Sequence, residues 1–199
     1  MILLERSLDV LAFAYALLFF PAPVFWLIIH PAIHFWRRFG NRSFWIALPL
    51  WLVNAAALGV LAPRIYAHRT PRNGFSALLG AALLVAGLAI GHHVHRIFGL
   101  KRLGGLPEMN PDRYPGGVVT SGIYGRVRHP RYLEYMLSFV GWALLTGAVG
   151  FFVLATLSVV LYLVVAPLEE RELREHYGDE YDSYARAVPR FIPRLRRPP

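Results

Sequence analysis

The chain has 199 residues, with 21 Lys and Arg against 12 Asp and Glu, a formal charge of +9 and no cysteine. Charged residues make up 17% of it, below the ~25% usual for soluble domains, and the mean hydropathy is +0.42. This composition excludes a disulfide framework, a thiolate metal site and a cysteine nucleophile, and it indicates a membrane protein. Long apolar runs make anionic lipids, and not nucleic acid, the expected partner of the positive charge.

The first two apolar runs predict membrane-spanning helices. Residues 8–29 contain one charged side chain, Asp9, near their start, and their length matches the ~20 residues that a helix needs to cross a ~30 Å hydrocarbon core. Pro21 and Pro23 remove helical hydrogen bonds, which membrane helices tolerate, so we expect a kink there. Residues 43–62 form the second run, and we expect Pro63 to end it.

Three shorter apolar runs follow. Residues 75–91 are rich in glycine and alanine, as a tightly packed interior helix would be, and we expect this helix to continue to His95. Residues 132–146 and 151–166 are short for a span, so they predict a helical hairpin packed against the other three helices and closed by Pro167. The predicted fold class is therefore an all-α integral membrane protein with five transmembrane helices and a C-terminal helical hairpin.

A charged tail, residues 168–199, follows the hairpin and holds seven Arg against seven Asp and Glu. Its pattern predicts an amphipathic helix up to Tyr177, a stop at Gly178 and a second short helix around residues 181–185. We therefore expect a short amphipathic tail beside the membrane.

The distribution of Lys and Arg predicts the orientation. Segments 30–42 and 92–131 and the tail carry 3, 7 and 7, whereas the N-terminus, the 64–74 loop and the 147–150 turn carry 1, 3 and 0. The positive-inside rule therefore puts the tail and the 92–131 loop in the cytoplasm. The three arginines of the 64–74 loop oppose this pattern.

The polar stretch 116–134, GGVVTSGIYGRVRHPRYLE, leads directly into the fourth apolar run. Its glycines free backbone amides, and Pro130 suits the first turn of a helix because its missing N–H costs nothing there. Arg128 and His129 are thus expected at a helix N-terminus, where free amides and the helix dipole favour an anionic group.

A second polar cluster, Glu169 and Glu170, follows the last apolar run. Two acids at this place are also compatible with a helix that simply leaves the lipid. Arg128 and Arg131 are compatible with interface anchors, and the nearby tyrosines are compatible with an aromatic belt at the membrane surface. The coincidence of both clusters at the two ends of one hairpin favours a functional site.

The residues at this end of the molecule follow a specific order. They are Gly122-Ile123-Tyr124, Arg128-His129-Pro130 with Tyr132, Glu169-Glu170, Leu173, Tyr177-Gly178, Tyr181, Tyr184 and Val188-Pro189. In order and spacing they resemble the superfamily of isoprenylcysteine carboxyl methyltransferases and phospholipid methyltransferases. The resemblance implies a multi-pass membrane enzyme that uses S-adenosylmethionine, releases S-adenosylhomocysteine and takes a lipophilic substrate from the bilayer.

The resemblance also implies a domain organisation and a site. Residues 1–199 would form one membrane domain, with 1–91 as a three-helix scaffold and 92–199 as the cofactor-binding loop, hairpin and tail, and the active site would face the cytoplasm. The residues carried over to the cofactor site are Gly116, Gly117, Val118, Val119, Gly122, Tyr124, His129, Pro130, Arg131, Tyr132 and Glu169.

Methyl transfer from a sulfonium needs alignment and exclusion of water more than acid–base chemistry. Arg128, His129 and Glu170 are the expected catalytic residues, and no metal is implied. Arg128 suits the carboxylate of the cofactor, and Glu169 suits its ammonium group or its ribose hydroxyls. If the nucleophile is an amine, Glu170 or His129 is placed to take its proton, whereas a carboxylate nucleophile needs no base.

Two positions depart from the pattern of the family. Glu134 stands where a small residue is usual, and an ionisable group at the start of a membrane helix indicates a function or a charge partner. We expect it to bind substrate at the portal or to pair with Arg128 or Arg131. The isoprenylcysteine branch carries an arginine one turn before the glutamate pair, where this chain has Val165 and Ala166, which argues against prenylcysteine as the acceptor.

Three other functions remain open at this point. Membrane sterol reductases share an RH-x-x-Y turn and a VP-containing tail, and they use NADPH. A di-metal membrane oxidase is suggested by histidines that are close in sequence, since imidazoles four residues apart on a helix can share a metal. These histidines are His30, His34, His92, His93 and His95. A membrane scaffold without catalytic activity is the third. The sequence specifies neither the methylated atom nor the oligomeric state.

Overall fold

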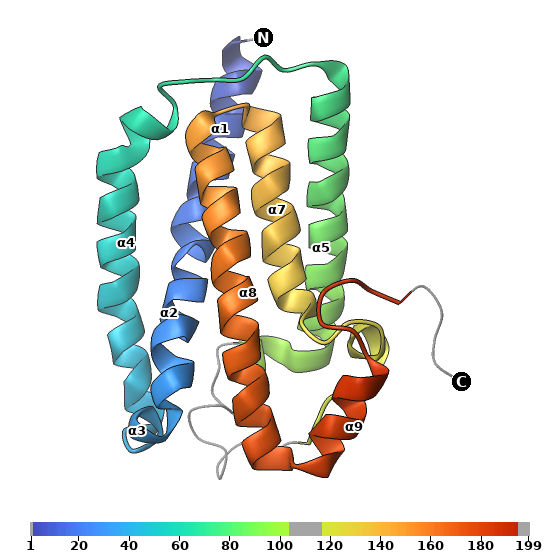
Figure 1. The fold of residues 1–199 in the computed structure, drawn as a ribbon. Coiled ribbons are helices and arrows are strands. Elements are labelled where there is room, and N and C mark those ends of the chain that lie inside the picture. Colours follow the sequence, from blue (N-terminus) through green and yellow to red (C-terminus); the bar gives the residue numbers. More distant parts are fainter. Residues whose placement is uncertain (1, 104–116, 195–199) are drawn as a thin grey trace.

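The computed structural model describes residues 2–103 and 117–194, and throughout that part the regular structure is helical (Figure 1). The elements in chain order are α1 (Ile2–Phe19), α2 (Pro21–Ile29), η1 (His30–Ala32), α3 (Ile33–Arg37), η2 (Gly40–Ser43), α4 (Phe44–Ile65), α5 (Gly74–Leu103), η3 (Gly122–Gly125), α7 (Pro130–Thr146), α8 (Val149–Tyr177) and α9 (Asp179–Ala187). The all-helical prediction is confirmed.

Prolines shape three of these helices in different ways. Pro21 starts α2 after a break at Phe20, which agrees with the expected kink in the first span. Pro63 and Pro167, in contrast, lie inside α4 and α8, so the expected helix ends at these two prolines are wrong. A proline removes one hydrogen bond, and a membrane helix has no competing water that would favour ending there. The apolar residues and the charged residues of α8 therefore belong to one continuous helix.

Four stretches are long and apolar enough to cross a membrane: Leu3–Arg37, Leu48–Ile65, Gly74–Ile97 and Val149–Tyr177. The molecule is thus a multi-pass membrane protein. Helix α7 has 17 residues, with Arg131 and Glu134 near its start, and is not among these four. It packs between α5 and α8 as the first half of the predicted hairpin. The fifth crossing stays a prediction.

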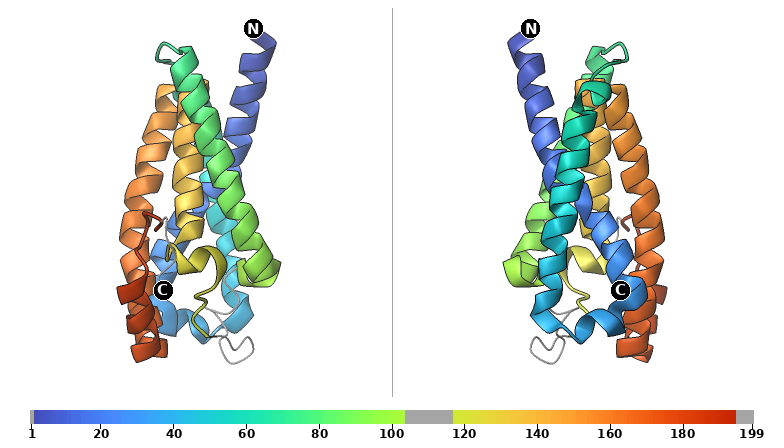
Figure 2. Two further views of the ribbon diagram at one scale, coloured as in Figure 1. Left: turned by 90° about the vertical axis from the view of Figure 1, so that its right-hand side faces the viewer. Right: turned by 90° about the vertical axis from the view of Figure 1, so that its left-hand side faces the viewer.

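The connecting segments gather at the two ends of the bundle. Both views in Figure 2 agree with Figure 1 that α1 begins at the end where the 64–74 loop and the α7–α8 turn lie. The segment around α3, the residues leading into α7, and α9 all lie at the opposite end. This is the grouping of segments that the count of Lys and Arg predicted.

Ion pairs fasten the 64–74 loop to the bundle. Arg69 donates to both carboxylate oxygens of Asp9, at 3.1 and 2.6 Å, and to the carbonyl of Thr146 at 2.9 Å. Arg72 forms an ion pair with Glu5. Two of the arginines that oppose the positive-inside pattern are therefore structural, since they join the first helix to the α7–α8 turn.

Helices α5 and α7 touch at their backbones. A Cβ atom placed on Gly80 would lie 2.9 Å from the carbonyl oxygen of Gly141, and one on Gly141 would lie 2.9 Å from that of Gly80. Small residues allow this approach, as expected for membrane helices. The other faces of α5 are open, with only 11% of its span buried, so its expected interior position is wrong.

We expect Gly80→Val to destabilise the protein by about 1–3 kcal/mol, because the added side chain must push α5 away from α7. Gly59→Val on α4 is the matched control, since no atom lies within 4 Å of a Cβ placed there. Thermal unfolding in detergent measures both. An equal loss of stability in the two variants would contradict the close α5–α7 contact.

Candidate functional site

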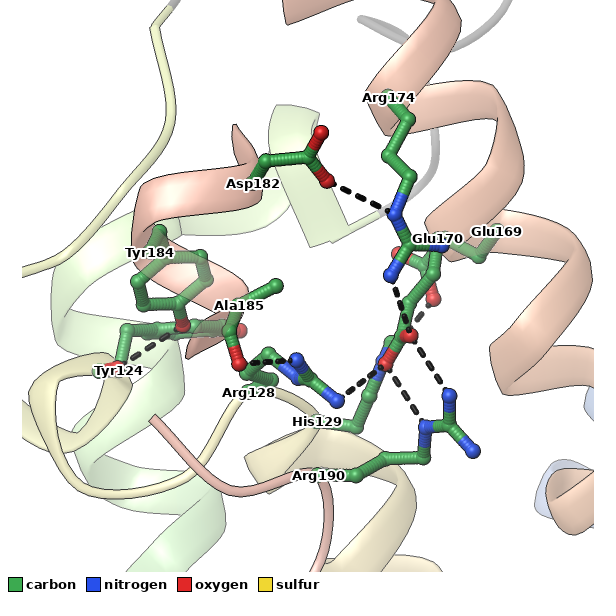
Figure 3. A network of polar contacts seen from close by, with 10 residues as sticks. All are labelled: Tyr124, Arg128, His129, Glu169, Glu170, Arg174, Asp182, Tyr184, Ala185 and Arg190. Atoms are coloured by element: carbon green, nitrogen blue, oxygen red, sulfur yellow. Dashed lines mark hydrogen bonds and ion pairs between the residues drawn. The ribbon is translucent and has the colours of Figure 1, made fainter. Parts of the chain in front are cut away.

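The candidate site lies where three segments meet: the residues leading into α7, the charged end of α8, and the chain after α9 (Figure 3). Main-chain hydrogen bonds join the first and third segments. The amides of Arg128 and His129 donate to the carbonyls of Pro189 and Arg190, at 2.9 and 3.2 Å, and the amide of Arg194 donates to that of Arg126 at 3.0 Å. Residues 189–194 thus form a strap along the start of α7.

His129 is the N-cap residue of α7, followed by Pro130 in the first turn. Its carbonyl accepts the amide of Leu133 at 3.0 Å, so the backbone begins the helix while the side chain stays free to face α8. The ring stacks on Tyr132, with centroids 5.2 Å apart and planes at 6°. Local sequence therefore fixes both the position and the plane of this imidazole.

Both ring nitrogens of His129 face carboxylates. Nε2 lies 3.0 Å from Oε1 of Glu170, and Nδ1 lies 3.2 Å from Oε2 of Glu169. Burial opposes the charged form of the ring, but the two carboxylates outweigh it and raise the pKa of His129. The geometry therefore fits an imidazolium that carries a proton on each nitrogen.

Glu170 is fully buried and is surrounded by cations. Arg190 binds it with two hydrogen bonds, of 2.8 Å from Nε and 2.7 Å from Nη2. Nη2 of Arg128 lies 3.2 Å away, and Nη2 of Arg174 lies 3.6 Å away. Together with His129, four cations meet one carboxylate, which leaves positive charge at the edge of the cluster for an anionic ligand.

Arg128 also binds the segment after α8. Its Nη1 donates to the carbonyl of Ala185 at 2.7 Å, and its buried Nε has no partner among the described residues. Nearby, the hydroxyl of Tyr184 donates to the carbonyl of Tyr124 at 2.9 Å. Helix α9 is thereby held against the turn that precedes α7.

The structure brings together the predicted residues Arg128, His129, Glu169 and Glu170, with Pro130 and Tyr132 beside them. Other predicted residues lie at the rim. Val118 packs on the cluster of Tyr181, Tyr184 and Val188. Gly122 begins η3, with φ +60°. Gly117 is exposed, whereas Val119 and Tyr124 are half-buried. Gly116 lies outside the described residues.

Two predicted residues point to other neighbours. Arg131 donates from Nε to the hydroxyl of Tyr135 at 3.1 Å, and its guanidinium lies 5.8 Å from that ring. The carboxylate of Glu134 occupies the place that a side chain on Gly91 of α5 would need. Within the described part of the chain, Glu134 forms no ion pair, and it lies outside the cluster around His129.

Sequence reasoning missed Arg190, Arg174 and Glu172 as members of this region. Arg190 directly follows Val188-Pro189, which was part of the resemblance, and Arg174 lies one turn after Glu170 on α8. Both residues are cations that pair with a buried acid, but before the fold is known their sequence positions give only a weak indication of this pairing. The third, Glu172, accepts from Nδ1 of His30 at 2.9 Å and from Nη2 of Arg37 at 2.5 Å.

The histidines that suggested a di-metal site face different partners. His30 contacts Glu172, whereas His34 lies 3.7 Å from Glu175. His93 bonds within its own helix to the carbonyl of Ala89 at 2.7 Å. Across residues 2–103 and 117–194, no three His, Asp or Glu side chains gather in a metal-binding arrangement.

Comparison with known proteins gives a family and several partial relatives. Residues 75–180 match the sequence model of the phospholipid methyltransferase family. Methanethiol S-methyltransferase from Pseudomonas deceptionensis is 35% identical over 118 residues, which are 59% of this chain and 43% of that protein. Protein-S-isoprenylcysteine O-methyltransferase from Schizosaccharomyces pombe is 35% identical over 79 residues, 38% of this chain and 33% of the relative.

The nickel-cobalt-cadmium resistance protein NccN from Alcaligenes xylosoxydans xylosoxydans is 34% identical over 78 residues, which are 39% of this chain and 37% of that protein. This chain thus spans less than half the length of each of these three relatives. No solved structure matches it significantly. The family match includes His129, Glu169 and Glu170 and covers more than half of the 199 residues. The chain therefore belongs to the phospholipid methyltransferase family.

Proposed function

We propose that this protein transfers a methyl group from S-adenosylmethionine to a lipophilic acceptor at the membrane interface. The observation that carries the proposal is the buried cluster in which His129 faces both Glu169 and Glu170 at the start of α7. Membership of the phospholipid methyltransferase family and the names of two relatives support methyl transfer. The donor follows from the resemblance to methyltransferases that use S-adenosylmethionine.

The residues present fit the amino-acid end of this cofactor. The buried Nε of Arg128 has no partner among the described residues and suits a carboxylate. Oε2 of Glu169 lies 3.2 Å from Nδ1 of His129, and since a carboxylate oxygen has two lone pairs, it can also accept from an ammonium group. The exposed backbone at Gly117 offers further room. When bound, the cofactor supplies an electrophilic methyl group on a positively charged sulfur.

The residues of the chain would orient the reactants and exclude water. His129, fixed by stacking and by two carboxylates, forms one wall of the site, and the strap of residues 189–194 covers its outer side. On the membrane side, Tyr132 stacks on Tyr162 with centroids 4.6 Å apart, which gives an apolar wall for a lipophilic acceptor. Such a site favours in-line transfer by alignment and desolvation.

The acceptor should carry no negative charge. One relative is named for methanethiol and another for isoprenylcysteine, so acceptors differ between members of this group. In this chain the turn before Glu169 consists of Val165 and Ala166, which are both fully buried. That turn supplies no cation for a carboxylate, which supports a neutral acceptor.

We also propose that the site faces the cytoplasm. The segment around α3, the described residues before α7 and the described part of the tail lie at one end of the bundle. In the sequence, segments 30–42, 92–131 and 168–199 contain 17 of the 21 Lys and Arg. The positive-inside rule places such an end in the cytoplasm, where anionic lipids attract it.

Glu169→Gln and His129→Gln should each weaken binding of S-adenosylmethionine by roughly tenfold or more, because each removes a charged partner of the ligand or of its neighbour. Isothermal titration calorimetry on the detergent-solubilised protein measures this effect. Glu175→Gln is the control, since Glu175 is on the same helix but exposed. Wild-type affinity in both site variants would remove the proposed site. Thermal stabilisation by NADPH and not by S-adenosylmethionine would favour the reductase alternative.

Stability should depend on pH through His129. Because its pKa is raised in the folded protein, the proton stabilises the fold fully below the unfolded value of 6.5, and this stabilisation is lost as pH rises through the folded pKa. The unfolding temperature of the wild type should therefore fall between neutral and alkaline pH. His129→Gln should flatten this part of the curve, and identical curves for the two proteins would contradict the imidazolium assignment.

A further inference from the structure

His30 is a buried histidine that the proposed methyl-transfer site does not use. It is the first residue of η1, directly after α2, and its side chain is 1% exposed. The ring stacks on Trp26, with centroids 5.0 Å apart and planes at 20°. Packing therefore fixes the plane of this imidazole, as a group that handles a proton requires.

The two nitrogens of His30 have different surroundings. Nδ1 lies 2.9 Å from Oε2 of Glu172, and because a carboxylate only accepts, Nδ1 carries the proton. The other oxygen of Glu172 accepts from Arg37 at 2.5 Å, so this carboxylate already has a cationic partner. Nε2 is buried and has no hydrogen-bond partner in the described part of the chain.

A neutral imidazole that is oriented by a carboxylate and has an open Nε2 is the arrangement of a general base. A buried polar atom without a partner also calls for an explanation, such as a ligand that it binds. His30 therefore combines an orienting partner on one nitrogen with a vacant lone pair on the other.

The position of His30 connects it with the methyl-transfer site. Glu169 and Glu172 are three residues apart on α8 and so lie on the same face, with Glu169 contacting His129 and Glu172 contacting His30. The two histidines thus border the same face of one helix.

The same region holds an aromatic cluster. Trp26, Tyr132 and Tyr162 belong to one group of packed side chains, which joins α2 to α7 and α8. The hydroxyl of Tyr162 is also buried without a hydrogen-bond partner among the described residues. An apolar wall with two open polar atoms suits a small, uncharged molecule that has one polar group.

We propose that His30, oriented by Glu172, binds and deprotonates a neutral thiol acceptor. This inference rests on the methyl transfer proposed above and names its acceptor. The S–H proton passes to Nε2 of His30, and the thiol sulfur forms a bond to the methyl carbon as the bond between that carbon and the sulfonium breaks. The products are a thioether, S-adenosylhomocysteine and one proton, which His30 then releases to water.

Charge and acidity both favour a thiol over the other nucleophiles. A carboxylate acceptor needs no base, and Val165 and Ala166 in the turn before Glu169 offer it no cation. A thiol of the cysteine type has a pKa of ~8.5, about two units closer to the ~6.5 of an ordinary imidazole than the ~10.4 of an alkylammonium is. Proton transfer to a histidine is therefore much easier from a thiol than from an ammonium group.

The test is methylation of a small uncharged cysteine derivative, N-acetylcysteine methyl ester, by the full chain in detergent micelles, with rates measured from pH 6 to pH 10. His30→Gln should lower kcat at neutral pH by roughly 10²-fold or more. The loss should shrink as pH approaches the pKa of the free thiol, because thiolate then forms without a base. Calorimetric affinity for S-adenosylmethionine and the unfolding temperature should match those of the wild type.

The matched control is His34→Gln, which removes the second histidine of the same segment. His34 pairs with Glu175, as His30 pairs with Glu172, but its side chain is 78% exposed. This variant should keep the wild-type rate at every pH. Glu172→Gln should lower kcat and leave KM for the thiol unchanged, since Glu172 is a positioning residue that acts through His30.

Wild-type thiol methylation by His30→Gln across the pH range would overturn the proposal, as would a loss that does not change with pH. If His30→Gln does not fold, the pH profile of Glu172→Gln decides in the same way. Failure of the wild type to bind S-adenosylmethionine would instead refute the proposed function. Cofactor binding with methylation of an uncharged lipid amine, and not of the thiol, would refute this inference alone.

Discussion

The arrangement of the site depends on the burial of one carboxylate, Glu170. Its side chain is fully enclosed, and an unpaired charge there would be costly, so cations must come from every side. They come from the strap through Arg190, from the start of α7 through Arg128 and His129, and from α8 itself through Arg174. Three segments distant in sequence are therefore held together by the need to pair the buried negative charge of Glu170.

Helix α8 divides the chemistry between its faces. Glu170 and Arg174 are four residues apart and face α9 and the strap. Glu169 and Glu172 are three residues apart and face the start of α7 and the segment of η1 and α3. One face is saturated with ion pairs and is suited to holding structure. On the other face, Glu169 contacts His129, and Nε2 of His30, whose ring stacks on Trp26, has no hydrogen-bond partner among the described residues. A ligand is expected on the second face.

Periodicity and composition predicted most of the fold, because a membrane helix needs an apolar run of fixed length and little else. The helix ends at Pro63 and Pro167 were wrong because backbone hydrogen bonding in lipid favours continuation over a break. The resemblance pointed to His129 and Glu169 as site residues, and their side chains lie 3.2 Å apart in the structure. It did not identify Arg190 or His30, because their roles come from contacts across 20 and 142 positions of sequence, which no local pattern records.

Because residues 189–194 complete the site, the site can assemble only after the membrane helices have been synthesised. Each apolar helix can enter the membrane as soon as it is synthesised, but the partners of the Arg128 and His129 amides, and the guanidinium that covers Glu170, come from the last described part of the chain. A protein altered in the strap would therefore pass through biogenesis as an ordinary set of membrane helices. Its defect would emerge only afterwards, as a buried acid with too few cations at the edge of the bilayer.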